Sequence, residues 1–157
     1  MGFFEFLKSN GTIALDMEAA DWKDAIRKGG SLLLQAGCCD GKYVEAMIDG
    51  CVRNGPYFVI GPGLAMPHAR PENGVIKTGY ALVTLKKGVE FGDGENDPVD
   101  VLVFMAAKDS ASHTEEAMSQ IAGFCDNLDW LMELRVAKDV KSVVDLLSRA
   151  EKQCAHF

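Results

Sequence analysis

The first third of the chain carries apolar side chains at the spacing of helices. In one such segment, Val44, Ile48 and Cys51 recur at positions i, i+4 and i+7 and therefore share one face. Asp21 and Asp40 precede the second and third segments and are typical N-cap residues. The predicted helices are residues 2–10, 21–37 and 40–54, and the predicted strand between the first two is residues 12–17.

After the third helix the pattern changes to that of strands. Residues 57–60 and 78–85 are rich in β-branched and aromatic side chains, which favour strands. Residues 99–107 are almost wholly apolar, as in a strand that is covered on both faces. A further short strand is predicted at residues 89–91, and residues 64–69 are expected to run extended into a loop. The last part of the chain predicts three helices, at residues 112–127, 129–137 and 141–150.

Helices at both ends of the chain with strands between them predict an α/β fold. We expect a single-domain sandwich over residues 1–157, with a mixed central β-sheet of about five strands and helices on both faces. The sheet is expected to be mixed because a short connection without a helix joins the two longest strands, which must then run antiparallel.

The balance of charge limits the partners. The chain has 157 residues, with 16 Lys and Arg against 23 Asp and Glu, which gives a formal net charge of −7. An acidic chain without a block of basic residues is a poor ligand for nucleic acids and for anionic membrane surfaces. No apolar run reaches the length of a membrane span, and the first ten residues do not form a signal peptide. The expected location is the cytoplasm.

Five cysteines are present, but none of them forms a C-x-x-C pair. This absence argues against a zinc site and against dithiol redox chemistry. The simplest interpretation is that at least four of the five are buried, reduced thiols in a cytoplasmic protein.

The candidate chemistry centres on His68 in the stretch "GPGLAMPHARPENG", residues 61–74. Pro67 and Pro71 restrict the backbone around the histidine, so the imidazole would lose little entropy when it acts. Arg70 lies two residues further on and could hold an anion with its guanidinium group. A histidine in a surface turn is the alternative explanation for this pattern.

His113 is the second candidate. It lies in the first turn of the helix that follows the longest apolar strand, and Ala117 and Ile121 follow at i+4 and i+8. This spacing places His113 on the apolar, inward face of the helix. Ser112 adds a hydroxyl at the helix N-terminus, where an anionic ligand is favoured.

Two histidines, an arginine, hydroxyl groups and a helix N-terminus are typical of a site that handles a phosphoryl group. The chain has no G-x-x-x-x-G-K-[ST] or G-x-G-x-x-G motif, so no nucleotide is expected. The two histidines have no evident third ligand, so we expect no metal and no other cofactor.

The stretch "GPYFVIGPGLAMPHARPENGVIKTGYALVTLKKGVEF", followed by "NDPVDVLVFMAAKD" and then His113, resembles a known family. It is similar to the enzyme IIA components of the bacterial phosphoenolpyruvate sugar phosphotransferase system. Within them it resembles the fructose–mannitol type, and most of all the L-ascorbate-specific subgroup. The likeness extends from about residue 3 to residue 150.

The resemblance implies a phosphocarrier. His68 would accept a phosphoryl group from the phosphohistidine of HPr, as a tele-phosphohistidine, and pass it to a cysteine of the cognate enzyme IIB. The membrane component, enzyme IIC, would be an indirect partner in the uptake of L-ascorbate. His113 would stabilise the transfer state. The residues themselves do not tell which ring nitrogen reacts, and they leave the formation of a homodimer open.

The sequence offers more than one candidate for the residues that bind the phosphate. In the wider family an arginine upstream of the active histidine assists with the phosphate, and Arg53 is upstream here, but we favour Arg70 together with Ser112 as phosphate-binding residues. An exposed apolar patch ringed by charge is expected around His68. Its predicted members are Leu64, Met66 and Val75.

Two further functions compete with a phosphocarrier. One is a regulatory module of the same fold, for another sugar or a pentitol, that signals through its state of phosphorylation. The other is a small-molecule-binding α/β protein with two structural histidines. The second alternative predicts that the protein is never phosphorylated.

Overall fold

The computed structural model describes residues 2–108 and 111–154, without the side chains of residues 111–114. The described residues form six α-helices, five strands and one short 3-10 helix. The helices are α1 (Phe3–Asn10), α2 (Trp22–Gln35), α3 (Gly41–Asn54), α4 (Ala111–Cys125), α5 (Leu128–Val136) and α6 (Val140–Cys154). The strands are β1 (Ile13–Met17), β2 (Val59–Gly61), β3 (Leu64–Ala65), β4 (Gly79–Val89) and β5 (Val99–Ala106), and the 3-10 helix is η1 (Pro71–Asn73).

The five strands form one mixed sheet in the order β1-β4-β5-β3-β2. The two central strands, β4 and β5, are antiparallel neighbours, with Leu82 opposite Val103. Strand β1 runs parallel to β4, and β3 runs parallel to β5. The mixed five-stranded sheet confirms the predicted fold class, including the antiparallel pairing of the two longest strands.

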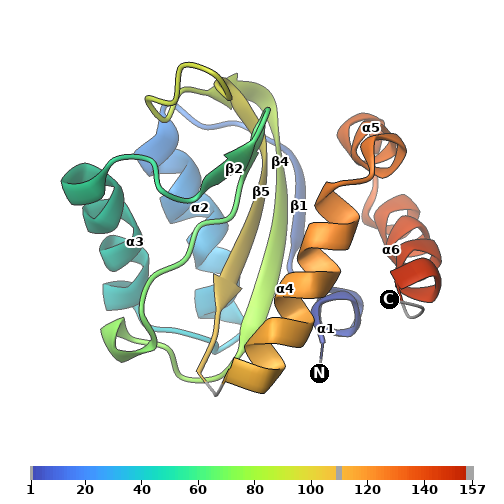
Figure 1. Cartoon of the computed structure of the whole chain (residues 1–157), viewed down its shortest axis with the longest axis horizontal. Helices are drawn as coiled ribbons and strands as arrows, with labels where there is room; N and C mark the ends of the chain where they lie inside the picture. The colour runs from blue at the N-terminus through green and yellow to red at the C-terminus, as the bar shows by residue number, and fades with distance from the viewer. Residues whose placement is uncertain (1, 109–110, 155–157) are drawn as a thin grey trace.

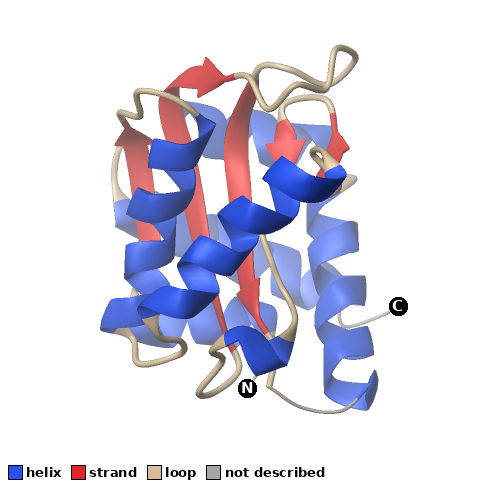
Figure 2. Cartoon of the chain, turned by 90° about the vertical axis from the view of Figure 1, so that its left-hand side faces the viewer, coloured by secondary structure: helices blue, strands red, loops and turns tan. Residues whose placement is uncertain are grey.

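Helices cover both faces of the sheet (Figure 1). Helices α2 and α3 lie on one face, while α1, α4 and α6 lie on the other and α5 packs beside them. Figure 2, turned so that the α2–α3 layer faces the viewer, shows these two helices in front of the strands. Strand β5 is therefore covered on both sides, as its continuous apolar sequence predicted. No helix in the described part of the chain is long and apolar enough to cross a membrane.

The two predicted N-caps are present. The Asp21 carboxylate accepts a hydrogen bond from the backbone N–H of Asp24 (2.8 Å), and the Asp40 carboxylate accepts from the N–H groups of Lys42 (3.0 Å) and Tyr43 (3.2 Å). Each cap satisfies a backbone donor that has no partner within its helix. The caps therefore fix where α2 and α3 begin, and α3 carries residues that reach the His68 loop.

Gly29, in the middle of α2, permits a close approach between the helix and the sheet. A Cβ atom added at this position would overlap Cε2 and Cζ of the Phe104 side chain on β5. At Gly30, a Cβ would lie 2.9 Å from Cγ2 of Val44 on α3. The two glycines lower helix propensity, but they let α2 pack directly against its neighbours.

Two predicted strand boundaries were wrong. Strand β2 begins at Val59 rather than at residue 57, because the residues before it form a turn. In this turn the N–H of Tyr57 donates to the Gly55 carbonyl, and the N–H of Val59 donates to the Pro56 carbonyl. The expected separate strand at 89–91 does not occur, because Val89 is the last residue of β4 and pairs with Val99. In addition, residues 64 and 65, expected to be merely extended, pair with β5 as strand β3.

The cysteines agree with the prediction of buried, reduced thiols. All five are free, four are buried, and Cys125 is partly buried. Burial raises the pKa of the Cys39 thiol to about 11 and that of Cys51 to about 12. These thiols are therefore protonated at neutral pH and are poor nucleophiles.

Candidate functional site

The His68 loop leaves strand β3 and is bound to the sheet on both sides. The Met66 N–H donates to the carbonyl oxygen of Phe58 (2.8 Å), and the Pro67 carbonyl accepts from the N–H of Met105 (3.1 Å). Met105 lies near the carboxyl end of β5, a common position for functional residues in open α/β sheets. The two residues that precede His68 are thus fixed by backbone hydrogen bonds.

The imidazole of His68 is held through one of its nitrogens. Nδ1 lies 2.7 Å from the carbonyl oxygen of Met66. A carbonyl oxygen can only accept a hydrogen bond, so Nδ1 must carry the proton in this contact. In the neutral ring, Nε2 then carries the free lone pair. Among the described residues, Nε2 has no hydrogen-bond partner. The His68 side chain is also partly exposed, and Nε2 is its ring nitrogen that is not already engaged.

Tyr57 and Phe58 pack beside the imidazole. The Tyr57 ring meets the His68 ring edge to face, with centres 5.5 Å apart and planes at 81°. The Phe58 ring lies 6.4 Å from the imidazole, centre to centre. The Tyr57 hydroxyl also donates a hydrogen bond to the His68 carbonyl oxygen (2.6 Å). One aromatic residue therefore contacts both the backbone and the ring of His68.

Tyr43, a buried residue of α3, ties the loop to β5 on the other side of His68. Its hydroxyl donates to the Met105 carbonyl (2.6 Å) and accepts from the N–H of Ala69 (3.0 Å). Burial raises the pKa of Tyr43 to about 12, so the hydroxyl keeps its proton and can serve as both donor and acceptor. Neither tyrosine was among the residues predicted from the sequence. The available signal was a tyrosine on an apolar helix face, because a buried phenol needs a hydrogen-bond partner.

His113 and Ser112 lie in the first turn of α4, which begins at Ala111. Their side chains lie outside the described part of the structure. Of the predicted inward stripe, Ala117 and Ile121 are buried, each at 1% exposure. The backbone of α4 begins shortly after the carboxyl end of β5, the same strand end that holds the His68 loop.

Both candidate arginines are exposed. Arg53 lies in the last turn of α3, and Arg70 precedes the short helix η1. Within residues 2–108 and 111–154, neither guanidinium takes part in an ion pair or a hydrogen bond. Neither guanidinium would therefore have to break an ion pair within the described residues in order to bind an anion.

The predicted composition of the apolar patch was wrong. Leu64 and Met66 are buried, at 4% and 5% exposure, because β3 packs against β5 and pairs Leu64 with Val101. Val75 is only partly exposed, since it forms a backbone bridge with Cys39. Other apolar side chains in the neighbouring segments are exposed instead: Tyr57, Ile60 and Ile76.

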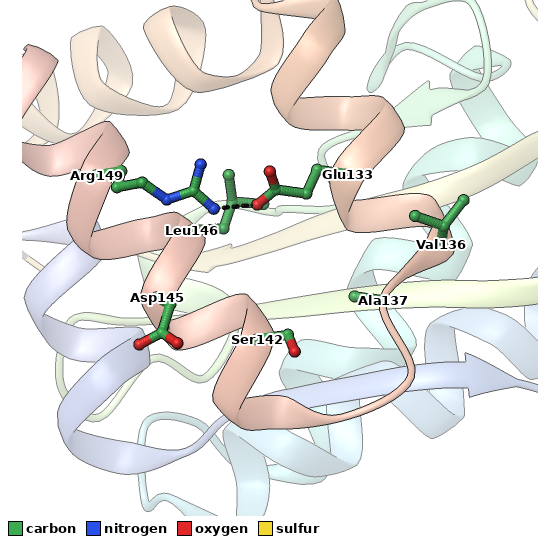
Figure 3. Close-up of a pocket in the computed structure, with 7 residues that line it drawn as sticks. All are labelled: Glu133, Val136, Ala137, Ser142, Asp145, Leu146 and Arg149. Carbon is green, nitrogen blue, oxygen red and sulfur yellow. Dashed lines mark hydrogen bonds and ion pairs between the residues drawn. The ribbon is translucent and has the colours of Figure 1, made fainter.

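A surface pocket of about 360 Å³ lies elsewhere, between α5 and α6 (Figure 3). An ion pair between Glu133 and Arg149 crosses it, and Leu146 lies beside this pair. Its lining contains none of the predicted site residues. The pocket is therefore separate from the chemistry proposed for the His68 loop.

Comparison with known families identifies the family of the chain. The family model described as "Phosphoenolpyruvate-dependent sugar phosphotransferase system, EIIA 2" matches residues 6–150. The chain belongs to this family. It is thus a phosphocarrier component of a phosphotransferase system, and the resemblance stated from the sequence is confirmed.

Individual relatives agree with the family assignment. The chain is 44% identical over 149 residues to the "Ascorbate-specific PTS system EIIA component" of Shigella flexneri, covering 95% of this chain and 97% of the relative. A crystal structure from Streptococcus mutans, described as a PTS IIA, superposes on the chain with a TM-score of 0.88 at 34% sequence identity. The match covers 97% of this chain and 96% of the Streptococcus mutans chain.

One solved structure shows how a relative meets its partner. It is the complex of the mannitol enzyme IIA with phosphorylated enzyme IIB from Escherichia coli. This enzyme IIA is 28% identical to the present chain, with a TM-score of 0.75, and the match covers 87% of this chain and 94% of the relative. In that protein, at least, the fold binds a phosphorylated IIB.

Proposed function

We propose that this enzyme IIA carries the phosphoryl group on Nε2 of His68. It receives the group from phosphorylated HPr and passes it to a cysteine of the cognate enzyme IIB. The observation that supports the choice of nitrogen is the contact between Nδ1 and the Met66 carbonyl at 2.7 Å, which leaves the Nε2 lone pair free. A neutral imidazole with one nitrogen held in this way is a suitable nucleophile.

Both transfers are substitutions at phosphorus. In the first, Nε2 of His68 attacks and the P–N bond to the donor imidazole of HPr breaks; the donor ring, protonated on its other nitrogen, takes the electron pair of that bond and leaves as a neutral imidazole. In the second, a cysteine thiolate of IIB attacks, the P–Nε2 bond breaks, and a P–S bond forms. Throughout, Nδ1 keeps its proton, and the N–H group keeps its hydrogen bond to the Met66 carbonyl oxygen. Such transfers depend mainly on in-line positioning and on neutralisation of charge.

We assign the neutralisation of charge to groups around His68. His113 stabilises the transfer state, and Arg70 and Ser112 bind the phosphoryl oxygens. Arg53 is the competitor of Arg70 because it is also exposed and also lacks an ionic partner among the described residues.

Comparison of Arg53→Gln with Arg70→Gln decides between the two arginines. We expect Arg70→Gln to slow acceptance of the phosphoryl group about 10- to 100-fold, because one charged hydrogen bond to the transferring group is lost. Arg53→Gln should react at close to the wild-type rate. Stopped-flow transfer from phosphorylated HPr measures both rates. The opposite ranking would transfer the role to Arg53.

The substrate branch proposed is L-ascorbate, because the Shigella flexneri relative bears that description at 44% identity. Enzyme IIA itself does not need to contact the sugar, so its specificity lies in the choice of IIB. The phosphorylated protein should therefore transfer its group rapidly to an ascorbate-type IIB and slowly to a mannitol-type IIB. Equal rates to both would remove the assignment to ascorbate.

The function as a whole is tested by reconstitution. The protein is mixed with phosphoenolpyruvate, enzyme I and HPr, and its intact mass is followed. We expect one phosphoryl group per chain, labile in acid, which disappears when IIB is added. A protein that gains no mass with active upstream components would overturn the proposal and favour a ligand-binding role. A group that is gained but never passed to any IIB would favour the regulatory module.

A further inference from the structure

Tyr57 holds His68 at two points, as described above: a hydrogen bond of 2.6 Å from its hydroxyl to the His68 carbonyl, and an edge-to-face contact between the two rings. We propose that Tyr57 is a positioning residue, which keeps the imidazole in the orientation that presents Nε2 to the phosphoryl donor. This inference rests on the proposed function of His68 as the acceptor.

The hydrogen bond from Nδ1 does not by itself fix the plane of the imidazole. A ring held by a single hydrogen bond can still pivot about it, and such pivoting moves Nε2 away from the line of attack. The Tyr57 ring, with its plane at 81° to the imidazole, opposes this movement. Because phosphoryl transfer depends on alignment of the attacking atom, a second contact of this kind acts on the rate of transfer.

Tyr57 is itself held against α3. Gly50 lies beside its ring: a Cβ atom at Gly50 would be 3.1 Å from both Cε1 and the hydroxyl oxygen of Tyr57. The Tyr57 ring also packs on Phe58, with centres 5.0 Å apart. The side chain is nevertheless 44% exposed, so it can shift if α3 pushes against it. Tyr57 thus connects α3 to His68. The position of its ring requires glycine at residue 50, where any side chain would crowd it.

The first test uses a small phosphoryl donor, because an exposed tyrosine could alternatively contact HPr. With phosphoramidate, the donor P–N bond breaks, ammonia leaves, and the P–Nε2 bond forms, so no protein surface is involved. We expect Tyr57→Phe, which loses only the hydroxyl, to react about 3- to 10-fold more slowly. Tyr57→Ala, which loses the ring contact as well, should be slower again, by about 10- to 100-fold in total.

Ile60→Ala is the matched control. Ile60 is 48% exposed on β2, close to the exposure of Tyr57, and it too presents apolar surface to solvent. We expect it to react with phosphoramidate at the wild-type rate. If the Tyr57 variants also react with phosphoramidate at the wild-type rate and are slow only with HPr, through a raised KM, then Tyr57 is a contact for HPr and the inference is overturned.

Gly50→Ala perturbs Tyr57 without changing Tyr57 or His68. Alanine has the higher helix propensity, so the melting temperature should stay the same or rise. The added Cβ displaces the Tyr57 ring, so the reaction with phosphoramidate should slow. Loss of rate without loss of stability cannot come from partial unfolding. An unchanged rate in this variant and in both Tyr57 variants overturns the inference.

A measurement that does not depend on phosphorylation separates this inference from the proposed function. In ¹⁵N NMR spectra of the unphosphorylated protein, His68 should be mainly in the Nδ1–H form. Tyr57→Ala should increase the share of the Nε2–H form, because the ring is then free to turn. If the wild-type protein accepts no phosphoryl group, the proposed function fails. In that case the NMR experiment still shows whether Tyr57 controls the orientation of the His68 imidazole. An unchanged tautomer ratio in Tyr57→Ala overturns the inference.

Discussion

His68→Ala should abolish phosphorylation of the protein by phosphorylated HPr. Nε2 is the only nitrogen of this imidazole whose lone pair is free, since Nδ1 donates to the Met66 carbonyl. Alanine offers no nucleophile in its place, and the buried thiols of the protein stay protonated at neutral pH. Intact mass after incubation with enzyme I, HPr and phosphoenolpyruvate should show no added phosphoryl group. Circular dichroism should show an unchanged fold, because His68 is partly exposed.

His113→Ala is the matched control for the loss of an imidazole. We expect this variant still to accept one phosphoryl group but to pass it to IIB about 100-fold more slowly, because a donor that stabilises the transfer state is lost. The two variants thus separate the roles proposed for the two imidazoles, acceptor and stabiliser. A His68→Ala protein that still gains an acid-labile phosphoryl group, together with a His113→Ala protein that gains none, would reverse the assignment.

The sequence was sufficient to predict the helices and the two longest strands, and it singled out the His68 loop as the candidate site. Local signals were enough for these elements. Asp21 and Asp40 cap their helices as predicted, and the unbroken apolar run of β5 marks a strand covered on both faces. The rigidity around His68 was likewise predictable, because Pro67 and its neighbours restrict the backbone whatever the rest of the chain does.

Contacts between distant residues could not be predicted in the same way. Tyr43 reaches Met105 and Ala69 across the fold, and nothing in the local pattern around Tyr43 specifies these partners. The predicted patch failed for a similar reason. Burial of Leu64 depends on the pairing of β3 with β5, which is a matter of sheet order rather than of local composition. The tyrosine contacts and the exposed surface near His68 thus became visible only in three dimensions.

Gly29 is the clearest case of a local signal that pointed in the wrong direction. On propensity alone it weakens α2, so Gly29→Ala would be expected to stabilise the helix by about 1 kcal/mol. In the folded protein, however, the new Cβ overlaps the Phe104 ring, which is fully buried at 0% exposure and cannot move aside easily. Overpacking of this kind costs about 1–3 kcal/mol.

Gly29→Ala should therefore lower the free energy of unfolding, by up to about 2 kcal/mol once the gain of about 1 kcal/mol in helix propensity is subtracted. Urea denaturation measures this value. Gly41→Ala, in α3, is the matched control, because no heavy atom lies within 4 Å of a Cβ at that position, and it should not destabilise the protein. Phe104→Leu should make Gly29→Ala less costly, since the smaller side chain leaves room for the new methyl group. If Gly29→Ala is as stable as wild type, close packing of α2 on β5 does not require this glycine.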